Sequence, residues 1–105
     1  MATYFGVIDG ETGNRKGDPA TSSPWTASKR STGKYRVNLD GSRSMPAPVV
    51  SVNSDDLTSY QDGVHKLINV SDIGQSSDGY WYFGVIVSDL DGRVVDSGWS
   101  FIAEV

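Results

Sequence analysis

Apolar and polar residues alternate along several short segments of this chain. The clearest is the segment 34–39, where Tyr35, Val37 and Leu39 alternate with polar residues, so one face of an extended chain is apolar and the other polar. No segment repeats its apolar residues at helical spacing, so no helix longer than a turn is expected. The pattern predicts seven strands, at residues 3–8, 34–39, 48–53, 65–70, 80–87, 93–96 and 99–105.

Five Asp-Gly pairs punctuate the chain, at residues 9–10, 40–41, 62–63, 78–79 and 91–92. Asp-Gly suits the positive φ angles of tight hairpin turns and therefore indicates antiparallel pairing. A chain of 105 residues is long enough for one domain with a modest core. We expect a single domain, residues 1–105, folded as an antiparallel, jelly-roll-like β-sandwich.

The pentapeptide Tyr-Phe-Gly-Val-Ile occurs twice, at residues 4–8 and again at residues 82–86. Each copy runs into a polar turn that contains Asp-Gly, which is typical of a strand followed by a reverse connection. We expect the two copies, near the two ends of the chain, to lie in similar sheet environments.

Two segments lack a strand pattern. Residues 9–33 are rich in Gly, Ser, Thr, Pro and charge, and loops of that length usually carry a function or lack fixed structure. We expect this segment to form a long loop or a partner-binding arm, with its lone Trp25 buried against its own domain or against a partner. The second segment, residues 53–63, is acidic and carries Tyr60.

Charge is unevenly distributed along the chain, whose net charge is −4. Residues 1–43 hold seven basic and four acidic residues, whereas residues 44–105 hold two basic and nine acidic residues. Ordinary solvated loops explain this asymmetry, and so does an amino-terminal region that docks on an acidic partner or a neighbouring copy. Nucleic acid is a poorer partner, because the molecule is acidic and its basic residues are dispersed. The docking interpretation gives as candidate partner-binding residues Arg15, Lys16, Trp25, Lys29 and Arg30.

The residue inventory offers little for catalysis or metal binding. The chain has no cysteine and one histidine, His65, which excludes thiolate and multi-imidazole metal sites. Neither a nucleophile elbow nor a phosphate-binding glycine loop is present. We expect no catalytic residue, no metal and no cofactor, and a hydrolase built on a serine and His65 is the remaining enzymatic hypothesis.

The segment Asp89-Leu90-Asp91-Gly92 is similar to the first half of a calcium loop. Arg93 occupies the next ligand position, and no glutamate closes the loop. A hairpin turn explains the same residues without a metal.

Membrane insertion is not expected. No apolar stretch approaches the ~20 residues needed to span a bilayer. The N-terminus lacks the basic, apolar and small-residue order of a secretion signal, so we expect synthesis in the cytoplasm.

Aromatic rings able to stack on sugars are concentrated in residues 80–83. Alternation sends Trp81 and Phe83 to one side of the strand and Tyr80 and Tyr82 to the other. Core packing explains Trp81 and Phe83 better, so the candidate glycan contacts are Tyr80, Tyr82 and Tyr60, with Trp25 as a further candidate.

The last strand has one apolar residue on its nominally polar side. Ile102 lies there between Ser100 and Glu104. It marks a contact between subunits, or it only reflects coverage of the sheet.

Three segments of the chain occur in an order known from one family. Residues 31–39 (STGKYRVNL) resemble the "TG-x-Y-x-V-x-F" opening of small β-domains at the tips of bacteriophage tail fibres and in related virion proteins. Residues 46–52 (PAPVVSV) resemble that family's "P-P-x-V-x-V" strand, and residues 91–103 its closing "DG-x-x-x-D-x-x-F-S-F-I-A" segment. The resemblance covers residues 25–105, implies a β-sandwich and trimer formation, and transfers no catalytic residue.

The chain departs from this pattern in three places. Trp99 stands where Phe is more usual, and the segment ends in Glu104-Val105 rather than in a small residue. The chain starts with its own Met and has no fibre stalk, which fits a free-standing subunit added to a virion surface.

The combined expectation is a non-enzymatic bacteriophage structural protein on the virion surface, most simply a capsid decoration (cement) subunit. Its partners would be other virion proteins of the shell or tail, with homotrimer formation and Ile102 at a contact. The alternative is a tail-fibre tip or lectin-like module that binds a host surface glycan.

Overall fold

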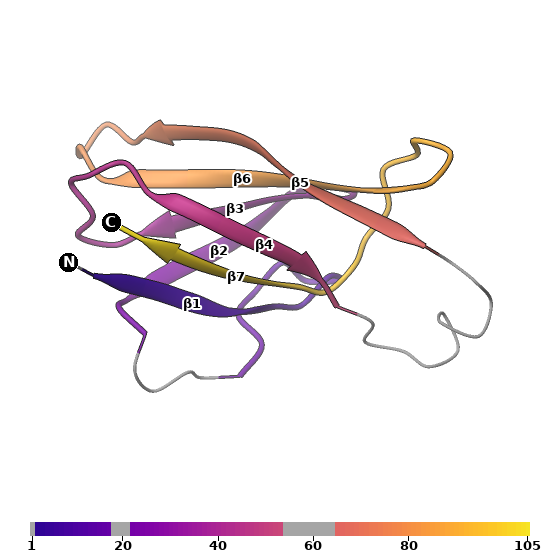
Figure 1. Cartoon of the computed structure of the whole chain (residues 1–105), viewed down its shortest axis with the longest axis horizontal. Coiled ribbons are helices and arrows are strands. Elements are labelled where there is room, and N and C mark those ends of the chain that lie inside the picture. The colour runs from indigo at the N-terminus through magenta and orange to yellow at the C-terminus, as the bar shows by residue number, and fades with distance from the viewer. Residues whose placement is uncertain (1, 18–21, 54–64) are drawn as a thin grey trace.

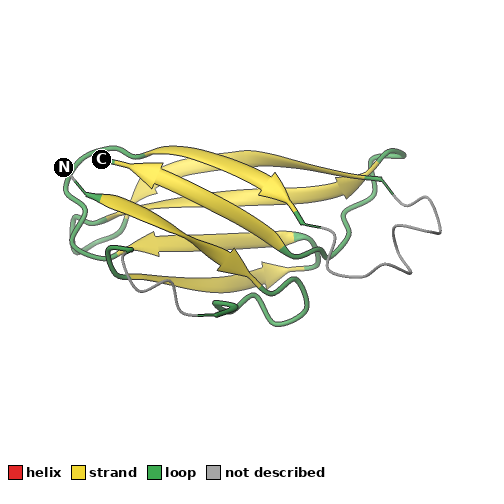
Figure 2. Cartoon of the chain, turned by 60° about the horizontal axis from the view of Figure 1, so that its bottom comes forward, coloured by secondary structure: helices red, strands yellow, loops and turns green. Residues whose placement is uncertain are grey.

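The computed structural model describes residues 2–17, 22–53 and 65–105, which contain seven strands and no helix. The strands form two antiparallel sheets and run along the long axis of the molecule (Figures 1 and 2). The three-stranded sheet has the order β1 (Thr3–Ile8), β7 (Trp99–Glu104), β4 (Ala47–Val52). The four-stranded sheet has the order β2 (Trp25–Ser31), β3 (Lys34–Leu39), β6 (Trp81–Asp89), β5 (Lys66–Gln75).

The chain passes between the two sheets four times, from β1 to β2, β3 to β4, β4 to β5 and β6 to β7. The first and last strands pair with each other, and Val105 N–H donates to the Ala2 carbonyl at 3.2 Å, so both ends of the chain lie at the same end of the sandwich (Figure 1). The predicted jelly-roll-like β-sandwich is confirmed.

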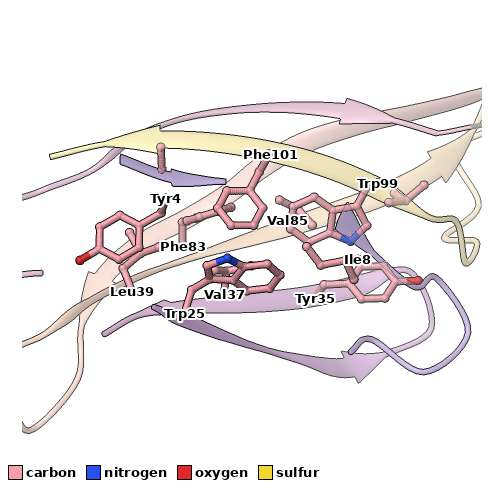
Figure 3. Close-up of a cluster of buried hydrophobic side chains, with 12 residues drawn as sticks. Tyr4, Ile8, Trp25, Tyr35, Val37, Leu39, Phe83, Val85, Trp99 and Phe101 are labelled. Atoms are coloured by element: carbon pink, nitrogen blue, oxygen red, sulfur yellow. The ribbon is translucent and has the colours of Figure 1, made fainter. Parts of the chain in front are cut away.

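A buried aromatic cluster joins the two sheets (Figure 3). Phe101 of β7 is its centre, with ring centroids 5.0 Å from Trp25 and 5.3 Å from Phe83 in edge-to-face arrangements. Trp99 packs beside Tyr35 at 5.9 Å between centroids. Such ring pairs contribute roughly 0.5–1.5 kcal/mol beyond the area they bury, so this cluster stabilises the packing of the two sheets on each other.

Residues 25–31 form β2, so the expectation that the whole of residues 9–33 is a loop or arm is wrong. β2 pairs with β3 through the Thr32-Gly33 turn, where Gly33 has a φ of 68°. A side chain at Gly33 would also collide with the Val87 and Val95 carbonyl oxygens. Backbone pairing, rather than an apolar pattern, therefore holds this polar segment in the sheet.

Residues 9–16 also fold onto the sandwich instead of projecting from it. Asp9 N–H donates to the Asn14 carbonyl at 2.9 Å, and Arg15 forms an isolated bridge with Ile8. Lys16 N–H then donates to the Val7 carbonyl at 2.7 Å. This part of the expected arm is a closed turn beside β1.

The predicted strand at residues 93–96 is absent, because only Val94 bridges Ser88. The side chain of Asp96 instead accepts hydrogen bonds from the β2–β3 hairpin, from Gly33 N–H at 2.8 Å and from Lys29 Nζ at 2.6 Å. Hydrogen bonds of the Asp96 side chain therefore hold this segment in place, whereas the sequence suggested backbone pairing in a strand.

The two copies of the repeated pentapeptide lie in different sheets and face opposite ways. In β1, Tyr4 and Ile8 point into the core and Phe5 points outward. In β6, Phe83 points into the core and Tyr82 points outward. The expectation that both copies share one environment is wrong.

Candidate functional site

The outer surface of the three-stranded sheet carries a row of apolar side chains, which we call the apolar face. Its central row is Phe5, Ile102 and Val49, which are register partners across β1, β7 and β4. Ile102 is 45% exposed and Val49 is 65% exposed. Apolar side chains aligned on neighbouring strands form a continuous patch, which is the surface that protein partners commonly cover.

The rest of this outer surface is small or uncharged at nearly every strand position. Val7, Ser100 and Ser51 form the row on one side of it, and Thr3, Glu104 and Ala47 the row on the other side. Glu104 is the one charged residue among these nine described positions. An interface centred on Ile102 would therefore desolvate few charges, as the centres of protein interfaces require.

The edges beside the apolar face are less available for strand addition. Ser23 N–H donates to the Thr3 carbonyl at 3.0 Å, and Phe5 N–H donates to Ser22 Oγ at 3.0 Å, which covers the free edge of β1. The opposite edge, β4, contains Pro48 and follows Pro46, and proline lacks the donor that a ladder needs. The face of this sheet, rather than its edges, is open to a partner.

Two of the basic residues expected to bind a partner contact the sandwich itself. The Arg15 guanidinium lies 4.2 Å from the Trp25 ring centroid and donates to the Trp25 carbonyl. Lys29 pairs with Asp96. Lys16 and Arg30 are exposed, so their binding of a partner stays a prediction. The structure does not bring them together with Ile102 in one site.

Trp25 is not available to a partner or to a sugar. Its side chain is only 2% exposed, packs on Phe101, and donates from Nε1 to the Phe5 carbonyl at 3.0 Å. Trp25 is therefore buried against its own domain, which is one of the two possibilities that the sequence left open.

A half-buried polar network surrounds Asp96 at one end of the sandwich. Burial acts to raise the pKa of the Asp96 carboxyl, but the hydrogen bonds from Lys29 and Gly33 outweigh it and hold that pKa below its ordinary value. Burial, partly offset by the Ser97 N–H, raises the pKa of Tyr35 to about 12. The Tyr35 hydroxyl donates to the Gly10 carbonyl at 2.6 Å. These hydrogen bonds connect the turn at Gly10, the β2–β3 hairpin and the segment at Asp96, which are far apart in sequence. Each of these polar groups therefore serves the structure.

The outer surface of the four-stranded sheet is chemically different. Arg36 lies over the Tyr82 ring, 4.0 Å from its centroid, and Arg43 lies 5.0 Å from the centroid of Tyr80. Both predicted glycan-contact tyrosines thus carry a guanidinium against the ring. The third, Tyr60, lies outside the described residues.

The described residues do not assemble a metal-binding group of side chains. Among residues 2–17, 22–53 and 65–105 there is no group of three or more His, Cys, Asp or Glu placed to hold a metal ion. His65 is exposed just before β5. Asp89 Oδ1 accepts the N–H groups of Asp91 and Arg93 at 2.9 Å each, so this carboxylate organises the turn that the sequence suggested.

Comparison with protein families, with curated proteins and with solved structures finds no match to this chain. Among the described residues, no helix is long and apolar enough to cross a membrane.

Sequence reasoning found Ile102 but missed its neighbours on the apolar face. Phe5 and Val49 stand 97 and 53 positions before it in the chain, and only the strand register brings the three together. The available signal was local: Val49 alternates outward with Ser51 once Val50 and Val52 are placed inward.

Proposed function

We propose that this chain is a non-enzymatic structural protein of a bacteriophage particle, exposed on the particle surface and acting as a capsid decoration subunit. The apolar face is its assembly surface, through which copies of the chain associate as a trimer. The observation that carries the proposal is the aligned row Phe5, Ile102 and Val49 on an otherwise weakly charged sheet face.

Two further observations support an assembly role. The resemblance of residues 25–105 to virion β-domains implies a trimeric surface protein. The closed turn at residues 9–16 and the pairing of Lys29 with Asp96 leave the basic amino-terminal segment less suited to grip a shell than the apolar face.

The test is incorporation into particles of the phage that encodes the chain. A lysine at Ile102 and at Val49 places two charges in the centre of the proposed contact, where burial of an unpaired charge is strongly unfavourable. We expect the Ile102→Lys, Val49→Lys protein to fold but to fall at least about tenfold in copies per purified particle, counted by mass spectrometry.

The matched control is a double lysine at exposed apolar side chains elsewhere, Leu67→Lys and Leu90→Lys, which lie 50% and 65% exposed. This control should enter particles at the wild-type level. Equal incorporation of both double variants, or absence of the wild-type chain from the particles, would contradict the proposal. Deleting residues 2–17 is not a usable test, because it removes β1 and its core residues Tyr4 and Ile8.

A further inference from the structure

We propose that the outer surface of the four-stranded sheet holds a second binding site, one for a carboxylate-bearing polysaccharide, built on two arginines stacked on tyrosines. We call this site the arginine patch and define it by Arg36, Asn38, Arg43, Tyr80 and Tyr82. It lies on the other sheet from the apolar face and does not depend on the proposed assembly role.

The stacking geometry pre-orients both guanidinium groups. Each lies within the ~6 Å range in which a cation is attracted by an aromatic face. Tyr82 lies on the outer side of β6, and Tyr80 directly precedes that strand. Two arginines that each stack on a ring lose little side-chain freedom when they bind a ligand.

Neither arginine of the patch forms an ion pair within the described part of the chain. The described residues place no carboxylate within ion-pair distance of Arg36 or Arg43, in contrast to Lys29, which is held by Asp96. A guanidinium stacked by its face still presents its N–H donors along its edge, where a carboxylate binds in bidentate fashion. The patch is therefore supplied with unused anion-binding donors in a molecule whose net charge is −4.

Neutral hydrogen-bonding groups continue from the arginines along the sheet. Thr26, Asn38 and Tyr82 are consecutive register partners on β2, β3 and β6, and they offer a hydroxyl, an amide and a phenol in one row. These groups suit the hydroxyls of a sugar ring. The row ends at Gly74 of β5, whose missing side chain leaves room for the Tyr82 hydroxyl.

Asp72 sets the boundary of the patch on the β5 side. Its carboxylate lies over Gly84, the register partner of Arg36, and would repel a bound anion from that side.

The balance of two arginines and several neutral groups favours a polysaccharide over other polyanions. Nucleic acid binding relies on many cations that neutralise successive phosphates, and an acidic molecule with Arg36 and Arg43 at the site and Lys34 on the same face of β3 provides few. A protein partner would need an apolar centre, whereas both tyrosine rings here carry arginine. A polysaccharide with spaced carboxylates needs few cations and many hydroxyl contacts.

The experiment is calorimetric titration of the full chain with oligomers of galacturonate, alginate and hyaluronate, beside neutral galactan and inorganic polyphosphate. We expect saturable binding of at least one uronate oligomer, none of galactan, and weaker binding of polyphosphate, which lacks sugar hydroxyls. Failure of all three uronates, or polyphosphate binding as tightly as the best of them, would overturn the proposal.

Variants separate shaped recognition from charge alone. Arg36→Lys keeps the charge but loses the planar donors, and we expect it to weaken uronate binding about tenfold, as should Arg43→Gln. Tyr82→Phe keeps the supporting ring and removes only the phenol, so it should weaken uronate binding less than Arg36→Lys does. Arg93→Gln removes one positive charge from an exposed turn and is the matched control.

Equal weakening by Arg93→Gln and Arg43→Gln, or full binding by Arg36→Lys, would overturn the site. Thermal unfolding of each variant shows that the fold is intact, which is expected because Arg43 and Arg93 are exposed and Arg36 is half-buried on the outer surface.

Discussion

The two copies of Tyr-Phe-Gly-Val-Ile are the same five residues placed in opposite phase. In β1 the tyrosine, glycine and isoleucine face the core, and Phe5 contributes to the apolar face. In β6 the phenylalanine and valine face the core, and Tyr82 lies outward under Arg36. One peptide thus gives the two outer surfaces of the sandwich their different chemistry.

The surroundings of each copy, rather than the copy itself, decide which face is buried. In β6 the phase that buries Phe83 also buries Val85 and Val87 and turns Gly84 outward. In β1 the opposite phase turns Gly6 inward, and the Trp25 indole fills the space left by its missing side chain. Shifting either strand by one residue would move its buried side chains to the outer face. The contact of each glycine with a distant residue, Trp25 for Gly6 and Asp72 for Gly84, therefore specifies the register of its strand.

Truncating the phenylalanine should give the largest difference between the copies. Phe83 is fully buried and touches Phe101 and Trp99, so Phe83→Ala should lower the free energy of unfolding by about 3–5 kcal/mol. Phe5→Ala on the outer surface should cost about 1 kcal/mol or less. Urea denaturation of both variants measures the difference, and similar losses would show that the two copies are not inverted.

Replacing the glycine by alanine should give the second largest difference in stability between the two copies. An alanine Cβ at position 6 would overlap the buried Trp25 indole, so Gly6→Ala should destabilise by about 1–3 kcal/mol. At position 84 the Cβ would meet the end of the flexible, exposed Asp72 side chain, which can move. Gly84→Ala should therefore change stability by less than about 0.5 kcal/mol, and a shared midpoint shift in urea would refute the assigned partners.

Removing the tyrosine hydroxyl should have a smaller effect on stability, and again in only one of the two copies. The Tyr4 hydroxyl donates to the Asp40 carbonyl at 2.9 Å, and its loss in Tyr4→Phe should cost about 1 kcal/mol. Tyr82→Phe should be close to neutral, because the ring beneath Arg36 is kept. Thermal unfolding measured on both proteins distinguishes them, and an equal drop in melting temperature would argue against this difference.

The turn after the first copy should show a pH effect detectable at a single residue. The backbone N–H groups of Thr12 and Glu11 donate to the Asp9 carboxylate and lower its pKa below the ordinary value of 3.8. Its contribution to stability is therefore complete above that value and fades as the pH falls through the lowered pKa. An NMR titration of the Asp9 carboxyl checks the direction, and a midpoint at or above 3.8 would contradict the turn geometry.

Local patterns were enough to predict the sheets but not every strand. Alternation located β3 and β7, because their apolar residues alone mark the buried face. β2 was missed because it buries only Trp25 fully and is held by its ladder with β3. Residues 93–96 look like a strand through Val94 and Val95, yet Asp96 hydrogen bonds fix them instead.

The outer surfaces were predictable only where one strand carried the information. Ile102 and Tyr82 could be placed outward from the alternation in their own strands. Phe5 could not, since its phase depends on Trp25, a contact between positions 20 residues apart. The stacking of Arg36 and Arg43 likewise depends on pairing between strands distant in sequence.

The most direct test of the apolar face as an association surface is the mass of the purified chain, measured by light scattering across a wide concentration range. The account predicts a concentration-dependent rise toward a trimer for the wild type, lost in Ile102→Lys and retained in Arg36→Gln. A chain that stays monomeric at the highest concentrations, or an Ile102→Lys protein that associates as well as the wild type, would contradict it.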